Sequence, residues 1–307
     1  MSRSIKDYLV IGLKGMAMGA ADVVPGVSGG TIAFISGIYE ELLTSISNVN
    51  LSLLQTLKKE GFKAAWKQVN GNFLLSLFIG IFISIVSLAK AIKYLLEHHP
   101  ILLWAFFFGL VLASVIYIAK QITKWNFIAI LVLFAGAILA YYITTLNPLV
   151  SENSSSLFLF LAGAIAICAM ILPGISGAFI LVLLGAYKPI LAAVNNKDIK
   201  VIALVGAGAI VGLLTFSRVL KWLFANYKNY TLAVLTGFII GSLNKIWPWK
   251  ETLSWRVNSH GINVPFKQQS ISPFSFEGEH QLVLAILLAI IGFGLILLLE
   301  KLAVKKQ

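Results

Sequence analysis

The residues best suited to bind a ligand in this chain stand in a short motif that occurs twice. Pro25-Gly26-Val27-Ser28-Gly29-Gly30-Thr31 interrupts one apolar run, and Pro173-Gly174-Ile175-Ser176-Gly177-Ala178-Phe179 interrupts another. Proline ends the preceding helix, glycine permits close backbone approach, and Ser or Thr is suited to cap the helix that follows. The free N–H groups and the positive dipole end of that second helix would attract an anion.

We therefore predict that the two breaks form two halves of one anion site. The candidate residues are Pro25, Gly26, Ser28, Gly29, Gly30, Thr31, Pro173, Gly174, Ser176 and Gly177. The alternative is that small residues merely let helices pack closely, and this is all we expect of Gly37, Gly80, Gly109 and Gly237. A repeated backbone break is costly in a membrane, and packing alone explains it poorly.

Two cationic pairs at i, i+3 spacing are further candidates. Lys90 is followed by Lys93, and Arg218 by Lys221. Each pair could bind a phosphate at one side of the membrane, with Arg218 the best candidate because guanidinium binds phosphate in a bidentate manner. The competing interpretation is that these long side chains only anchor the ends of helices at the interface.

Three carboxylates lie close to the first break in the sequence. These are Asp22, Glu40 and Glu41. Acids within a membrane suggest proton coupling. Glu40 and Glu41 could instead mark the membrane interface, so Asp22 is the more interesting of the three.

The composition indicates the class of protein. The chain has 307 residues, of which 59% are hydrophobic and 12% charged, and its mean hydropathy is +0.90. Several apolar runs of about 20 residues predict an all-α polytopic membrane protein. Because the Lys and Arg lie in loops and at helix ends, the net charge of +12 indicates anionic lipid headgroups rather than nucleic acid. A single cysteine and four scattered histidines predict no disulfide, metal or cofactor.

The chain divides into two halves, residues 1–150 and 151–307. The first half has a re-entrant helix hairpin at 8–46, whose second arm runs from Thr31 to about Ile46, an amphipathic segment at 47–72 and three spans within 73–146. The second half has a hairpin at 157–194, spans within 200–247 and at 281–300, and a polar outer loop at 250–280.

The halves resemble each other in sequence. When residues 23–46 are aligned with 171–194, eight of 24 positions are identical, including Tyr39 with Tyr187, and the offset then changes from 148 to 128. Each repeat would contribute one hairpin and three spans, and an odd number of spans predicts that the repeats are inverted. The distribution of Lys and Arg places both termini and segment 47–72 in the cytoplasm and loop 250–280 outside.

The motif at Gly15 to Thr31, with the later Leu172 to Gly177, resembles the bacterial family of PopT-type polyprenyl-phosphate transporters, and the resemblance covers essentially the whole chain. It implies a multi-pass protein of the bacterial cytoplasmic membrane that translocates undecaprenyl phosphate for recycling in cell-envelope synthesis. Its partners would be this lipid and the bilayer, while the oligomeric state stays open.

Two alternatives remain at this stage. The chain also resembles undecaprenyl-pyrophosphate phosphatases, but Gly29 and Gly177 stand where their motif has Arg, and the paired glutamates are missing. Hydrolysis would then lack an obvious acid, base or activating cation, so we expect no enzyme. A transporter of small anions or ions could use the same broken helices.

Overall fold

The computed structural model describes residues 3–24, 27–146, 155–257 and 263–304. The helices of the first half are α1 (Ile5–Val23), α2 (Gly29–Ile35), α3 (Tyr39–Ser47), α4 (Leu51–Glu60), α5 (Phe62–Gln68), α6 (Gly71–His98), α7 (Pro100–Lys120) and α8 (Phe127–Thr145). Pro25 and Gly26 lie outside the described residues.

The second half begins with three helices in the same order and then differs, since it has no counterpart of α4 and α5 and carries a strand pair. It contains α9 (Ser156–Ile171), α10 (Gly177–Leu183), α11 (Tyr187–Asn195), α12 (Ile199–Ser242), the 3-10 helix η1 (Leu243–Ile246), the strands β1 (Lys250–Val257) and β2 (Asn263–Ser270), the 3-10 helix η2 (Pro273–Ser275) and α13 (Leu282–Val304). The short helices α10 and α11 have the same lengths as α2 and α3, seven and nine residues.

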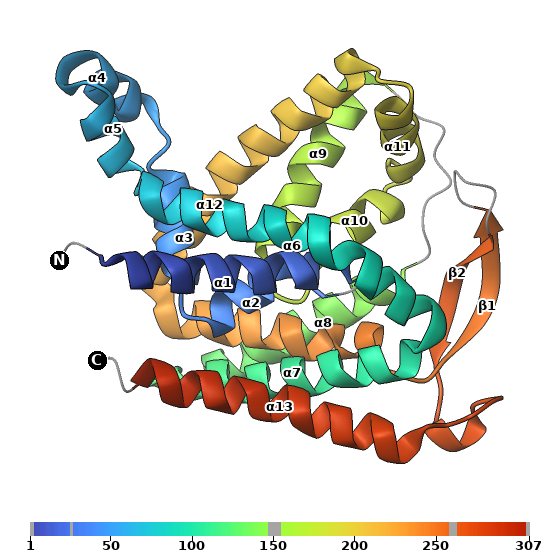
Figure 1. The fold of residues 1–307 in the computed structure, drawn as a ribbon. Coiled ribbons are helices and arrows are strands. Elements are labelled where there is room, and N and C mark those ends of the chain that lie inside the picture. The colour runs from blue at the N-terminus through green and yellow to red at the C-terminus, as the bar shows by residue number, and fades with distance from the viewer. Residues whose placement is uncertain (1–2, 25–26, 147–154, 258–262, 305–307) are drawn as a thin grey trace.

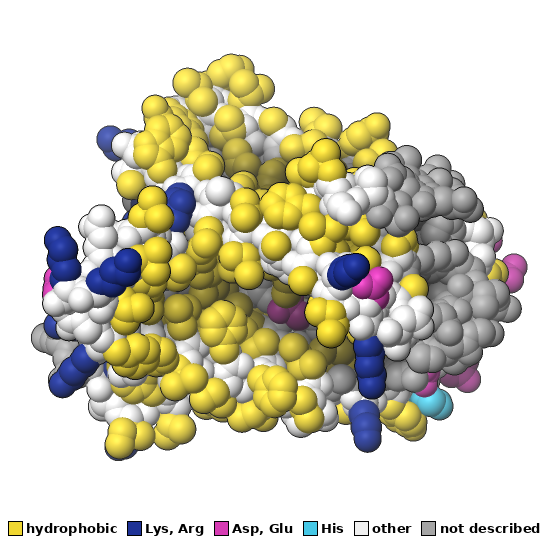
Figure 2. All heavy atoms as spheres, turned by 90° about the horizontal axis from the view of Figure 1, so that it is seen from above, with side chains coloured by type: hydrophobic (Ala, Val, Ile, Leu, Met, Phe, Trp, Pro, Cys, Tyr) yellow, Lys and Arg dark blue, Asp and Glu magenta, His cyan; other side chains and the backbone are white. Residues whose placement is uncertain are grey.

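The protein is a helical, multi-pass membrane protein. Among the described residues, four segments are long and apolar enough to cross a membrane: Gly71–Leu88, Pro100–Lys120, Phe127–Thr145 and Ile199–Ile246. Two shorter apolar helices are Ser156–Ile171 and Leu282–Leu298. Figure 2 shows a face dominated by hydrophobic side chains, as a surface in contact with lipid requires.

Helix packing follows the same scheme in both halves. In the first half α1 packs along α6, and in the second α9 packs along the N-terminal part of α12. A Cβ on Gly80 would collide with the Gly12 carbonyl, and one on Gly208 would collide with the Phe160 carbonyl. The backbones therefore approach closely at corresponding positions.

The third span of each half packs against the other half. Helix α8 lies along the C-terminal part of α12, and α13 lies along α7. Gly237 and Gly109 permit these contacts, since a Cβ on either would collide with a carbonyl of the facing helix. The prediction that Gly80, Gly109 and Gly237 serve close packing is confirmed.

The prediction for Gly37 was wrong. It has φ of +72°, and a Cβ there would meet nothing within 4 Å. Gly37 ends α2 in a left-handed turn that only glycine adopts without strain. The second arm of the hairpin is therefore two helices, α2 and α3, and Gly185, with φ of +74°, forms the same turn between α10 and α11.

Three further segments show detail that the sequence alone did not predict. The amphipathic segment 47–72 contains two helices, α4 and α5, separated at Gly61, which has φ of +84°. The first two spans of the second half are two helical arms that meet at a kink at Tyr227 and share the label α12. The polar loop 250–280 contains an antiparallel strand pair in which Lys250 faces Ser270 and Val257 faces Asn263.

The elements at the two ends of the molecule are different. Figure 1 shows the two chain ends and the projecting pair α4–α5 at one end, and the β1–β2 hairpin at the opposite end. The helices α1, α6, α7, α8 and α13 run between these ends. Both chain ends thus lie at the same end of the molecule as α4–α5, which carries Lys58, Lys59, Lys63 and Lys67.

Candidate functional site

The first break is stabilised by its own polar side chains. Ser28 is the N-cap of α2, and its Oγ accepts a hydrogen bond from the Gly30 N–H at 3.1 Å. Asp22, near the end of α1, accepts one from the Gly29 N–H through Oδ1 at 2.7 Å. Two of the N–H groups that begin α2 are therefore satisfied by groups of the same hairpin.

The second break has a similar cap but lacks the carboxylate. Ser176 caps α10 and accepts a hydrogen bond from the Phe179 N–H at 3.4 Å. Met170 stands where the first repeat has Asp22. Gly174 has φ of +85°, and a Cβ there would lie 2.8 Å from the Ser242 Oγ. A left-handed conformation and close packing both require glycine at this position.

The two breaks are in direct contact. The Gly174 N–H donates to the Thr31 Oγ1 at 3.0 Å. The Ser28 hydroxyl donates to the Met170 carbonyl at 3.1 Å, and the Tyr39 hydroxyl to the Ile171 carbonyl at 3.2 Å. These carbonyls belong to the last turn of α9, where no helical N–H follows to bond them. Hydroxyl groups of the first hairpin thus satisfy backbone groups that the second break exposes.

This contact is buried. Thr31 is 1% exposed, Ser28 2% and Tyr39 3%. Gly30 permits the approach, because a Cβ there would lie 3.0 Å from the Met170 carbonyl oxygen. The structure therefore brings Ser28, Gly30, Thr31 and Gly174 together, while the binding of an anion by these residues stays a prediction.

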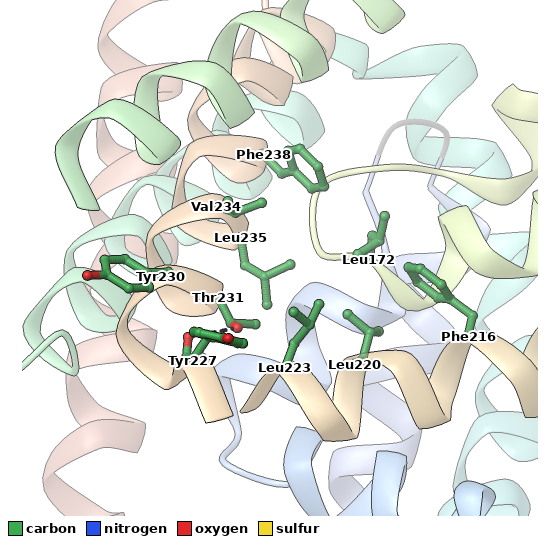
Figure 3. Close-up of a pocket in the computed structure, with 10 residues that line it drawn as sticks. All are labelled: Leu172, Phe216, Leu220, Leu223, Tyr227, Tyr230, Thr231, Val234, Leu235 and Phe238. Atoms are coloured by element: carbon green, nitrogen blue, oxygen red, sulfur yellow. Dashed lines mark hydrogen bonds between the residues drawn. The ribbon is translucent and has the colours of Figure 1, made fainter. Parts of the chain in front are cut away.

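An apolar pocket of about 460 Å³ adjoins the second break. Figure 3 shows Leu172 of the break facing the pocket between two arms of α12 that diverge at the Tyr227 kink. The lining residues are Leu172, Phe216, Leu220, Leu223, Tyr227, Tyr230, Thr231, Val234, Leu235 and Phe238. A hydrocarbon chain would fit such a lining, and a polar group at the break would lie beside it.

The predicted basic residues lie elsewhere. Arg218 is exposed on α12, and its guanidinium donates to the Val49 carbonyl at 2.9 Å, just beyond α3. Lys90 is exposed on α6. Neither forms a hydrogen bond or ion pair with the residues of the breaks that the structure describes, so any role in binding the anion would belong to a different step.

Of the three predicted carboxylates, only Asp22 contacts a break. Glu40 forms an ion pair with Lys228 at 2.8 Å, and Glu41 with Arg3 at 2.5 Å. Both pairs are partly exposed and join the first hairpin to other segments. Within the described parts of the chain, no three His, Cys, Asp or Glu side chains gather as a metal site would require.

Sequence reasoning missed Tyr39 and the pocket. Tyr39 is one of the identical positions of the repeat, so the alignment held a signal for it. The pocket depends on the kink at Tyr227, and no proline or glycine marks this position in the sequence.

Broken helices that meet inside a multi-pass helical protein, beside an apolar pocket, define a transporter-like membrane protein. The chain belongs to the VCA0040-like, undecaprenyl phosphate translocase-like family, whose model matches residues 18–264.

Two curated relatives carry the name polyprenyl-phosphate transporter. The one from Vibrio cholerae is 52% identical over 99% of this chain and 100% of its own length. The one from Staphylococcus aureus is 32% identical over 77% of this chain and 85% of its own length. No solved structure shows significant similarity to the chain.

Proposed function

We propose that this protein translocates polyprenyl phosphate, in particular undecaprenyl phosphate, across the bacterial cytoplasmic membrane so that the carrier lipid can be reused. The family and the names of the two relatives support the substrate class. The observation that carries the proposal is an apolar pocket lined by Leu172 of the second break, which is itself hydrogen-bonded to the first break. A lipid with a phosphate head and a hydrocarbon tail has both kinds of group to place there.

In this proposal the backbone at the breaks binds the phosphate, and the α12 pocket accommodates part of the prenyl tail. The Asp22 carboxylate now accepts a hydrogen bond from the Gly29 N–H, where a phosphate oxygen could accept one. Protonation of Asp22 would free this N–H for the lipid, which would couple translocation to a proton. Lys90 and Arg218 would attract the headgroup before it enters.

The alternation of access would use the two-fold repetition of the chain. Each half has a hairpin packed on one long helix, and each third span packs on the other half. We infer an inverted repeat with two re-entrant hairpins, so that a rocking movement of one half against the other would open the site to either side. The hydrogen bonds between the breaks would separate and re-form during this movement.

The orientation follows from charge. The termini and α4–α5, which carries Lys58, Lys59, Lys63 and Lys67, lie at one end of the molecule, and we assign this end to the cytoplasm. The β1–β2 hairpin at the opposite end would then face outward.

The test is reconstitution in liposomes with a fluorescent polyprenyl phosphate, whose exposure to an external quencher reports movement between leaflets. The wild-type protein should move the lipid, while Ser28→Ala should slow it by about tenfold or more, the cost of losing a hydrogen bond to a buried group. Asp22→Asn keeps an acceptor for the Gly29 N–H but cannot gain or lose a proton, so it should slow the movement as well. The control is Ser87→Ala, whose hydroxyl only donates to the Ile83 carbonyl of its own helix. Equal rates with and without wild-type protein would refute the proposal.

The same liposomes separate the alternatives. Uptake of inorganic phosphate without lipid movement would indicate a small-anion transporter. Release of phosphate from polyprenyl pyrophosphate would indicate an enzyme, and we expect none because Gly29 and Gly177 occupy the positions where the phosphatase motif has Arg.

A further inference from the structure

Two lysines lie close together where α12 gives way to the β-hairpin. Lys245 belongs to η1, and Lys250 begins β1. The segment between them is Ile246-Trp247-Pro248-Trp249. Both lysine side chains are half-buried, unlike the exposed lysines of α4 and α5.

Backbone and aromatic groups hold the two ammonium groups in place. The Lys250 Nζ donates to the Lys245 carbonyl at 2.6 Å and lies 3.8 Å from the centre of the Trp104 ring. The Lys245 Nζ lies 4.4 Å from the centre of the Phe179 ring, which belongs to α10. Lys245 therefore sits against the hairpin of the second break, and Lys250 against α7.

Neither ammonium group has a carboxylate partner among the described residues. By contrast, Arg3 and Lys228 each pair with a glutamate. Glu251, Glu277 and Glu279 are close in sequence, but their side chains are exposed and form no ion pair with either lysine. Burial, and to a smaller extent the charge of Lys245, lowers the pKa of Lys250 to about 7.

Two half-buried cations without a counter-charge are costly, because burial removes water and their charges repel. Each ammonium group has three N–H donors, and within the described part of the chain the hydrogen bond to the Lys245 carbonyl uses one donor of Lys250. A phosphate monoester carries up to two negative charges on three oxygen atoms. It would supply both the counter-charge and the missing hydrogen-bond acceptors. An interface anchor would instead extend its ammonium group into water.

We propose that Lys245 and Lys250 form a phosphate-monoester binding site at the β-hairpin end of the protein, against α7 and α10. Taking this phosphate as the headgroup of the transported lipid rests on the proposed function. The site would then receive the headgroup at this end of the molecule, before it reaches the second break.

The experiment measures binding to the purified wild-type protein in detergent. The probes are farnesyl phosphate, inorganic phosphate and uncharged farnesol, and the readout is tryptophan fluorescence, since Trp104 and Trp249 flank the site. Lys245→Met and Lys250→Met, which keep most of the apolar stem, should each weaken farnesyl phosphate binding by about tenfold or more, the value of a hydrogen bond to a charged group. Lys200→Met, an exposed lysine at the start of α12, should bind as the wild type does.

A second measurement avoids variants that fold poorly. Lysines of the wild-type protein are acylated with and without farnesyl phosphate, and the modified positions are read by mass spectrometry. The ligand should protect Lys245 and Lys250 but leave Lys200 unchanged. Equal modification with and without ligand, or binding within twofold of wild type in both methionine variants, would overturn the proposal.

These measurements also distinguish a lipid phosphate from a free phosphate, and the failure of this site from the failure of the proposed function. Binding of farnesyl phosphate well above that of inorganic phosphate supports a lipid headgroup, and equal binding supports a free phosphate. Protection of the lysines without lipid movement in liposomes would support the site and refute the proposed function. Lipid movement that both methionine variants retain in full would refute the site alone.

Discussion

The hydrogen bond from the Gly174 N–H to the Thr31 hydroxyl allows a quantitative test of how the breaks are joined. It measures 3.0 Å, and Thr31 is 1% exposed. Thr31→Val keeps the shape of the side chain but leaves the buried N–H without its acceptor. An unsatisfied buried donor costs about 1–3 kcal/mol, so the melting temperature should fall by roughly 2–6 °C.

The assay is thermal unfolding of the purified protein in detergent, followed by intrinsic fluorescence. Thr31→Ser retains the hydroxyl and should recover most of the loss. Thr215→Val is the matched control, because the Thr215 hydroxyl donates only to carbonyls of its own helix. If Thr31→Val melts within 1 °C of wild type, or no lower than the Thr215 variant, the contact between the breaks does not stabilise the protein and the reasoning fails.

Three further predictions concern packing, pH and surface charge. Gly208→Ala should destabilise the protein by about 1–3 kcal/mol, because its Cβ would overlap the Phe160 carbonyl of α9. Gly206→Ala is the control and should not, because a Cβ there would meet no atom within 4 Å. Equal melting temperatures of the two variants in thermal unfolding would contradict the prediction. Because the pKa of Lys250 falls from 10.5 to about 7 on folding, the unfolded chain binds the extra proton between these values, and stability should rise with pH across this window by at most about 1.4 kcal/mol per unit. The melting temperature of Lys250→Met should rise less with pH than that of wild type, and an identical pH profile would contradict the assignment. Glu40→Gln removes a partly exposed ion pair with Lys228 and should change stability by less than about 1 kcal/mol, so a larger loss in the same assay would show that the pair matters more than its exposure implies.

Much of the fold could be predicted because the signals are local. Apolar runs of sufficient length define the spans, and Pro, Gly and Ser at Pro173, Gly174 and Ser176 mark a break and the cap of the next helix. The alignment of the two motifs also predicted corresponding helices in each half. The turns at Gly37 and Gly61 were missed because glycine in a membrane protein signals close packing as readily as a left-handed turn.

That the two motifs bind an anion stays a prediction. The structure shows that the two breaks are in contact, but the sequence could not say which atoms would meet. Asp22 was selected for its charge, and its bond to the Gly29 N–H appears only when α1 and α2 are placed together. Glu40 and Glu41 carry the same charge, yet in the folded protein they pair with Lys228 and Arg3 near the surface.

The sequence by itself determined the class of protein, the two helix breaks and the correspondence of Ser28 with Ser176 in the repeat. Hydropathy, backbone preference and repetition are properties of the chain, so no folded structure is needed to see them. Only the tertiary structure decided that the hydroxyls of Ser28 and Thr31 bond the backbone of the other break, and that a pocket opens at the kink of α12. The physical reason is that these bonds join residues more than 140 positions apart. Their geometry depends on how α1, α9 and α12 pack, which no local pattern encodes.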